Sequence, residues 1–196
     1  KGDIQLESGD LNFAGNAITA TLGTVKIVGD AEVSTTADLT AGGGVLISST
    51  NDVTLGAVNA TVLSGGSATG SITATFDAGA SASVTANTGS SNDTLTLDNI
   101  ATTFTVDTGA DNDTINVIAV DTGSTIAGND GIDTFDIDAT GKMATYNGGD
   151  GNDVFDVASA AVRATIVGGD GTDTLTLGNG TYLNVVGFTG IEKVNV

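Results

Sequence analysis

Apolar and polar residues alternate in short runs that recur along the second half of the chain. Each run begins with an aspartate, has apolar residues two and four positions later, and places a polar residue between them. The apolar pairs are Leu95/Leu97, Ile115/Val117, Phe135/Ile137, Phe155/Val157 and Leu175/Leu177, and the residues between them are Thr96, Asn116, Asp136, Asp156 and Thr176. A period of two is typical of a strand with one buried face. The pattern therefore predicts one short strand in every 20-residue unit.

A second apolar position recurs with the same 20-residue spacing, at Val106, Ile126, Tyr146, Ile166 and Val186. Each unit thus reads turn, strand, turn, strand, and no segment carries a sustained apolar stripe at helical spacing. Units of this kind stack at about 4.8 Å per coil. We therefore expect an all-β protein, a right-handed parallel β-helix (β-solenoid) with coils of about 20 residues.

The first 87 residues keep a similar apolar period but lack the recurring aspartate. The matching apolar positions, at the same 20-residue spacing, are Val25/Ile27 with Val45/Ile47 and Val33 with Val53. Apolar pairs also recur about every seven residues near the start, a spacing that suits three short strands per coil. We expect one continuous solenoid, with a separate N-terminal β-sandwich as the alternative. Strand-like sequence at both ends indicates coils of a longer solenoid.

The composition removes several classes of function. His and Cys are absent, so the chain has no disulfides, and it lacks the commonest general base and transition-metal ligand. The net charge of −19, from 24 acids against five bases, should repel nucleic acid and anionic membranes. No apolar stretch approaches the roughly 18 residues needed to span a bilayer. Lys142 and Arg163 are too isolated to form a polysaccharide-lyase centre. We therefore expect no enzyme, no nucleic-acid partner and no membrane insertion.

The recurring aspartates, again at the 20-residue spacing, are Asp93, Asp113, Asp133, Asp153 and Asp173. In a stacked solenoid their carboxylates would form a column about 4.8 Å apart and would repel one another unless cations lay between them. Adjacent glycines would let backbone carbonyls turn toward the same centre. Such hard oxygen ligands suit Ca²⁺ rather than zinc or copper. A ladder of metal-free Asx turns is the alternative, because Asp, Asn and Gly are ordinary turn residues.

Two blocks of the repeat carry a longer motif, GGDGNDVFD (148–156) and GGDGTDTLT (168–176). They resemble the RTX nonapeptide GGxGxDxUx, in which U is a large apolar residue and whose copies form a calcium-binding β-helix. Block 128–136 has Asn129 in place of the second glycine, and the two earlier blocks keep one glycine of three. The resemblance covers about 90 residues, which is under half of the chain.

By this resemblance, residues 88–196 are an RTX-like calcium-binding solenoid and residues 1–87 are metal-poor. The implied ligands are the carboxylates of Asp133, Asp153 and Asp173, the less complete blocks' Asp93 and Asp113, the turn aspartates Asp130 and Asp150, and backbone carbonyls around Gly128, Gly148, Gly149, Gly151, Gly168, Gly169 and Gly171. The opposite turns, such as Asp138-Ala139 and Ala158-Ser159, lack the motif. We therefore expect one calcium column rather than two.

The chain is most similar to the RTX segments of Gram-negative surface-layer (S-layer) proteins. The similarity lies in the single expected calcium column, the absence of cysteine and the Thr- and Ala-rich composition. The resemblance implies a calcium-dependent structural module of a protein secreted to the bacterial cell surface, which folds when it meets calcium. It implies self-association into a lattice or filament, with cell-surface polysaccharide as a further partner. Residues 37–57 are instead similar to filamentous-haemagglutinin-type repeats. An extension or binding module of a large RTX or haemagglutinin-like adhesin is therefore the alternative.

Overall fold

Parallel strands make up the regular structure of the chain. The computed structural model describes residues 3–12, 17–20, 23–35, 38–77, 84–98, 103–138, 143–158, 163–178 and 185–196. Within these ranges there are 20 strands and no helix. All pairings between the strands are parallel. The described part of the chain accordingly contains no helix with the length and apolarity needed to cross a membrane.

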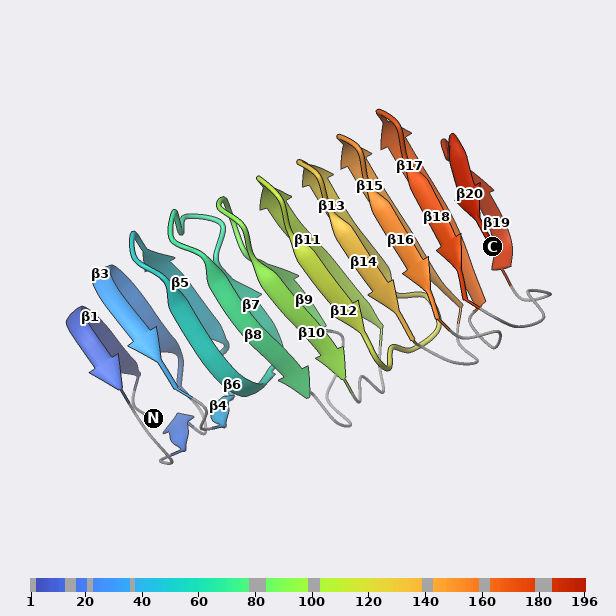
Figure 1. Ribbon diagram of the computed structural model, residues 1–196. Helices are drawn as coiled ribbons and strands as arrows, with labels where there is room; N and C mark the ends of the chain where they lie inside the picture. The colour runs from blue at the N-terminus through green and yellow to red at the C-terminus, as the bar shows by residue number, and fades with distance from the viewer. Residues whose placement is uncertain are drawn as a thin grey trace.

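Most strand pairings form two columns, because a strand pairs with the equivalent strand one coil later (Figure 1). Near the N-terminus, residues 33–34 also pair across the columns with residues 53–54. The first column contains β1 (Ile4–Asn12), β3 (Val25–Ser34), β5 (Val45–Ser49), β7 (Val62–Ser64), β9 (Val84–Asn87), β11 (Phe104–Ala110), β13 (Thr125–Asp130), β15 (Met143–Asp150), β17 (Arg163–Asp170) and β19 (Val185–Thr189). The second column contains β2 (Ile18–Ala20), β4 (Leu39–Ala41), β6 (Val53–Ala60), β8 (Ile72–Asp77), β10 (Thr94–Asp98), β12 (Thr114–Val117), β14 (Thr134–Ile137), β16 (Val154–Val157), β18 (Thr174–Leu177) and β20 (Lys193–Asn195). The chain therefore winds as a parallel β-solenoid, which confirms the predicted fold.

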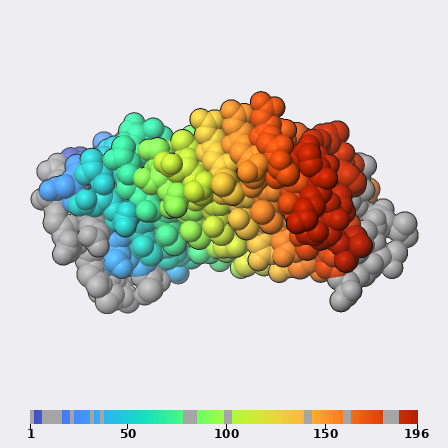
Figure 2. Space-filling model, turned by 45° about the horizontal axis from the view of Figure 1, so that its top comes forward, coloured from blue at the N-terminus to red at the C-terminus, as the bar shows by residue number. Residues whose placement is uncertain are grey.

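The strand register keeps a 20-residue period through most of the C-terminal half. Thr85, Thr105, Thr125, Thr145 and Thr165 pair one with the next along the first column. The second column keeps the same spacing from β10 to β18. Equivalent residues of successive coils therefore lie directly above one another. Figure 2 shows the result, an elongated body in which the coils follow one another along the long axis.

The N-terminal coils vary more in length. The pairings predicted from the sequence are present, Val25 and Ile27 with Val45 and Ile47, and Val33 with Val53. Ile4 pairs with Val25, so that coil is longer than the 20-residue repeat, whereas Val45 pairs with Leu63, so that coil is shorter. The short strands β2 and β4 supply a third segment in the first coils, in agreement with the seven-residue apolar spacing. Strand pairing continues from β7 to β9 and from β8 to β10.

The inward-pointing apolar residues form a core between the two columns. All of the apolar pairs predicted to face inward from β10 to β18 are buried, except that Leu177 is half-buried. The rings of Phe135 and Phe155 stack with centroids 4.7 Å apart, and Tyr146 meets Phe135 edge-on at 6.4 Å. Full burial of a side chain of this size contributes about 1.5–3 kcal/mol. The apolar side chains that the period-two pattern turns inward therefore make the main hydrophobic contribution to the stability of the fold.

One predicted register is wrong in the last coil. Val106, Ile126, Tyr146 and Ile166 stack and are buried as predicted. However, Ile166 pairs with Phe188 and not with Val186. A register shift opposite the step from Ala164 to Thr165 inserts an extra residue into β19, which is how a β-bulge breaks a repeat. The side chain of Val186 lies outside the described residues.

A buried aspartate column as candidate metal centre

The recurring aspartates lie at one edge of the solenoid, each immediately before a strand of the second column. Asp93 precedes β10, and Asp113, Asp133, Asp153 and Asp173 precede β12, β14, β16 and β18. Each of the five is at most 1 % exposed. The 20-residue register therefore stacks these carboxyl groups as one buried set, which we call the aspartate column.

One carboxylate oxygen of each aspartate joins successive coils. The Oδ1 atom accepts a hydrogen bond from the backbone N–H of the aspartate one coil earlier. The pairs, donor first, are Asp93–Asp113, Asp113–Asp133, Asp133–Asp153 and Asp153–Asp173, each at 2.8 Å. At the start of the column, Asp93 Oδ1 accepts from the Ile72 N–H at 2.7 Å. At its end, Glu192 Oε2 accepts from the Asp173 N–H at 2.8 Å, so a glutamate completes the ladder.

The other carboxylate oxygen, Oδ2, has no hydrogen-bond partner in any of the five aspartates, although all five of these atoms are buried. Leaving a buried acceptor unpaired is destabilising by about 1–3 kcal/mol, and by more when the group is charged. Native structures rarely contain such atoms, and a set of them in one place needs a physical explanation. The column therefore requires a positive partner for Oδ2, which is either a proton or a cation.

Three glycines allow the last three carboxyl groups to approach the backbone closely. Gly128, Gly148 and Gly168 each lie five residues before a column aspartate, and a Cβ at any of them would overlap that aspartate's Oδ2. The Cβ position at Gly128 lies 2.9 Å from the Gly148 carbonyl oxygen, and that at Gly148 lies 2.6 Å from the Gly168 carbonyl oxygen. At each of these glycines a carboxylate oxygen and a carbonyl oxygen of the next coil thus lie close together.

The remaining turn glycines allow neighbouring coils to approach closely. Gly149 and Gly151 have φ angles of 118° and 142°, and a Cβ at either would overlap a carbonyl of the preceding coil. Gly169 and Gly171 repeat this geometry one coil later. Where the motif lacks its second glycine, Asn129 adopts a φ of 77° and its side-chain amide donates to Asp107 Oδ1 at 2.8 Å. Asn is one of the few residues that tolerate this conformation.

The turn aspartates lie on the outside of the same turns. Asp130 pairs in register with Asp150, and Asp150 with Asp170, and all three are exposed. They differ in this from the column aspartates, which are buried. Of the residues predicted to form the opposite turns, Asn99, Ala139, Ser159 and Asn179 lie outside the described residues.

Burial disfavours the charged form of the column carboxyl groups. It raises the pKa of Asp93, Asp113, Asp133 and Asp153 from 3.8 to about 6. The hydrogen bonds from backbone N–H groups lower the pKa by less. The nearby Thr88 hydroxyl also lowers the pKa of Asp93, and the Thr108 hydroxyl that of Asp113, although each hydroxyl points its hydrogen at a carbonyl oxygen of the next coil. Neighbouring carboxylates raise the pKa further. At neutral pH these four groups therefore carry negative charge in surroundings that oppose it.

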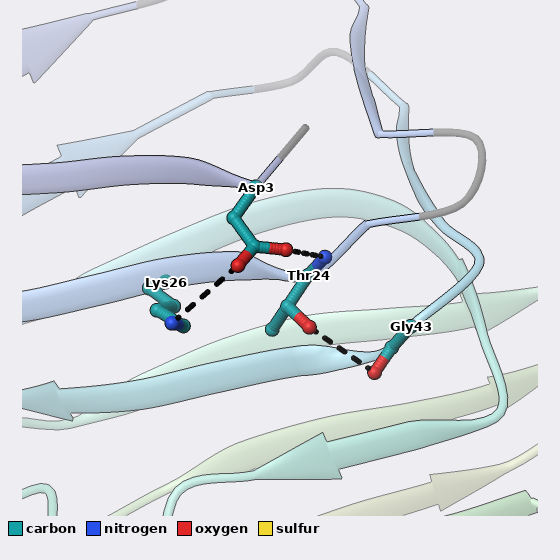
Figure 3. Close-up of polar contacts among 4 residues, drawn as sticks. All are labelled: Asp3, Thr24, Lys26 and Gly43. Atoms are coloured by element: carbon teal, nitrogen blue, oxygen red, sulfur yellow. Dashed lines mark hydrogen bonds and ion pairs between the residues drawn. The ribbon is translucent and has the colours of Figure 1, made fainter. Parts of the chain in front are cut away.

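The first coil shows an aspartate whose charge is compensated within the chain. Asp3 Oδ1 accepts a hydrogen bond from the Thr24 N–H at 2.8 Å, and Lys26 Nζ lies 3.6 Å from Asp3 Oδ2 (Figure 3). The Thr24 bond and the nearby lysine both lower the pKa of Asp3. In the aspartate column, by contrast, the charged groups that shift the pKa are all carboxylates. Among the described residues, the column therefore has no basic side chain that plays the part Lys26 plays for Asp3.

Among the described residues, no group of three or more His, Cys, Asp or Glu side chains is placed to hold a metal ion. Side chains alone therefore do not make a metal centre there. An ion beside Oδ2 would also need carbonyl oxygens of the turns, and at Gly128 and Gly148 such an oxygen lies close to the position of the aspartate Oδ2. Carboxylate and carbonyl oxygens are the ligands that Ca²⁺ prefers. The donor set therefore fits calcium, held jointly by side chains and backbone.

Sequence reasoning missed three residues of this site, namely Glu192, Thr88 and Thr108. Glu192 lies 19 residues after Asp173, one short of the repeat, so its place in the ladder was hidden by the shorter last coil. Thr88 and Thr108 occupy the position of the first motif glycine, which aligning the blocks would have revealed.

No protein-family model matches the chain, and no curated protein or solved structure is significantly similar to it. The RTX resemblance therefore depends on the motif itself.

Proposed function

We propose that residues 88–196 form an RTX-type, calcium-dependent structural module of a secreted bacterial surface protein. In this proposal, calcium ions beside the aspartate column hold successive coils together. The observation that carries it is the set of five buried Oδ2 atoms without a hydrogen-bond partner. Asp133, Asp153 and Asp173 would supply carboxylate oxygens, and the glycine-rich turns would supply carbonyl oxygens.

Charge repulsion makes the effect of calcium on folding large. Carboxylates stacked about 4.8 Å apart repel each other by roughly 3 kcal/mol per adjacent pair at an effective dielectric constant of about 20. A divalent cation next to a carboxylate replaces this repulsion by attraction and supplies the partner that its Oδ2 lacks. Because the unfolded chain has no such site, the free energy of binding is also free energy of folding.

The repeated architecture supports a structural role rather than catalysis. A solenoid presents long strand faces along its axis, which suit lateral contacts between copies. We therefore propose an S-layer lattice subunit, located at the bacterial cell surface and self-associating when calcium is present. The same rod would serve as an extension module of a large adhesin, and the two roles differ in what the isolated chain does.

Calcium removal tests the proposal directly. We expect the circular-dichroism β signal and the thermal transition to be retained in millimolar calcium and to be lost in large part with a chelator. Asp153→Ala should weaken calcium binding, whereas Asp156→Ala, on the exposed face of β16, is the matched control and should not. Identical spectra and melting with calcium and with chelator would remove the proposed function.

Electron microscopy of the calcium-loaded chain separates the lattice from the adhesin. Ordered two-dimensional arrays that dissolve on chelation are expected for an S-layer subunit. Single rods that bind cell-surface polysaccharide or host cells, and that form no array, would favour the adhesin instead.

A further inference from the structure

Two coils of the aspartate column differ from the others at one buried position. Thr88 and Thr108 lie five residues before Asp93 and Asp113, where the later coils have glycine. The strand register aligns these threonines with the glycines of the later coils. Both threonines are fully buried, so each side chain lies within the turn and not on its surface.

The threonine hydroxyls bind the carbonyl oxygens of the following coil. Thr88 Oγ1 donates to the Thr108 carbonyl oxygen at 2.9 Å, and Thr108 Oγ1 donates to the Gly128 carbonyl oxygen at 3.2 Å. In the coils with glycine, an aspartate Oδ2 and a carbonyl oxygen of the next coil lie close to the position that the Cβ of a larger residue would take. In the threonine coils a side chain stands at this position, and its hydroxyl binds a carbonyl oxygen that would otherwise be open to a cation.

The threonine-containing coils are joined by direct hydrogen bonds. Asp93 Oδ1 and Asp113 Oδ1 keep their bonds from backbone N–H groups of the preceding coil. The two hydroxyl bonds add a second connection toward the following coil. The threonine coils are thus joined by side-chain hydrogen bonds that need no ion. Gly148 and Gly168 have no side chain that could make these bonds.

We propose that Thr88 and Thr108 close the first part of the column to cations, so that the chain binds calcium at three positions, beside Asp133, Asp153 and Asp173. This inference rests on the proposed function, since it concerns where calcium binds. It divides the column into two parts. In the part up to β12 a threonine hydroxyl lies at the carboxyl groups of Asp93 and Asp113, and the coils keep their structure without calcium. The part from β14 to β18 requires calcium.

A calcium titration of the whole chain by calorimetry, with excess magnesium to occupy exposed carboxylates, counts the positions. We expect three in the wild type, four in Thr108→Gly and two in Gly148→Thr. Thr125→Gly, on the exposed side of β13, is the control and should keep three. Any other non-zero count in the wild type, or an unchanged count in Thr108→Gly, would overturn the inference and leave calcium binding intact. No binding by the wild type would overturn the proposed function instead.

Hydrogen exchange of the wild-type chain tests the same division without any substitution. With a chelator, we expect amides of β10 and β12 to stay protected, and amides of β14, β16 and β18 to exchange on the order of tenfold faster than with calcium. Equal loss of protection from β10 to β18 would contradict the role of the threonines. Equal protection with calcium and with chelator throughout would contradict the proposed function.

Discussion

Replacing Asp153 by asparagine should change stability in opposite directions with and without calcium. Asparagine keeps an Oδ1 acceptor for the Asp133 N–H, which donates to Asp153 Oδ1 at 2.8 Å in the wild type. It replaces the unpaired Oδ2 by an amide group that carries no charge. The substitution therefore removes one buried charge and leaves the ladder of backbone bonds in place.

The size of the effect without calcium follows from the cost of the buried charge. Burial raises the pKa of Asp153 from 3.8 to about 6. A shift of this size corresponds to about 3 kcal/mol at neutral pH, and solvent near the turn screens part of it, so we expect a gain of about 1–2 kcal/mol. With calcium bound, the same change removes one partner of a buried charge pair, which is destabilising by about 3–5 kcal/mol.

Urea unfolding at neutral pH, followed by circular dichroism, measures both effects. Asp153→Asn should raise the midpoint in chelator and lower it in millimolar calcium. Asp156→Asn, on the exposed face of the same strand, is the control and should shift neither midpoint appreciably. A decrease in both conditions would show that the carboxylate stabilises the column without any ion, which would refute the reasoning.

Three further predictions follow from the same structure. With chelator, the free energy of unfolding should increase as the pH falls from neutral through about 6 toward 4, because the folded state binds protons more tightly at the aspartates with raised pKa. With calcium, the free energy of unfolding should decrease over the same range, because protons compete with the ion. Urea midpoints measured at stepped pH give both slopes. Phe155→Ala should cost about 3–5 kcal/mol in either condition, because it opens a cavity beside the stacked Phe135 ring, as thermal unfolding would measure. Gly149→Ala should cost about 1–3 kcal/mol, because of its φ of 118°, and should weaken calcium binding in calorimetry. Its control, Ala158→Gly at the exposed residue after β16, should leave calcium affinity unchanged.

Most of the fold was predictable because the repeat is strict where the core is built. Alternation around positions such as Leu95 and Phe155 specifies which face is buried, and the 20-residue period specifies which coils pair. The last coil could not be placed by the same rule. A single inserted residue moves the partner of Ile166 to Phe188, and nothing in the local sequence marks where a bulge absorbs it.

The candidate site was predictable in outline only. The spacing of the aspartates indicated a shared edge, and the structure places Asp133 and Asp153 there with their side chains buried. The sequence could not show that one oxygen of each carboxyl group is used by a backbone N–H and the other is unpaired, because this depends on side-chain rotation within the turn. The role of Thr108 depended equally on the register between coils.

Crystals of the chain grown with calcium, measured for anomalous scattering by the metal, test the central claim most directly. We expect calcium peaks beside Asp133, Asp153 and Asp173, with Oδ2 at about 2.3–2.6 Å from each ion. Well-ordered turns in millimolar calcium, with no anomalous peak and with Oδ2 hydrogen-bonded as a protonated acid, would contradict it.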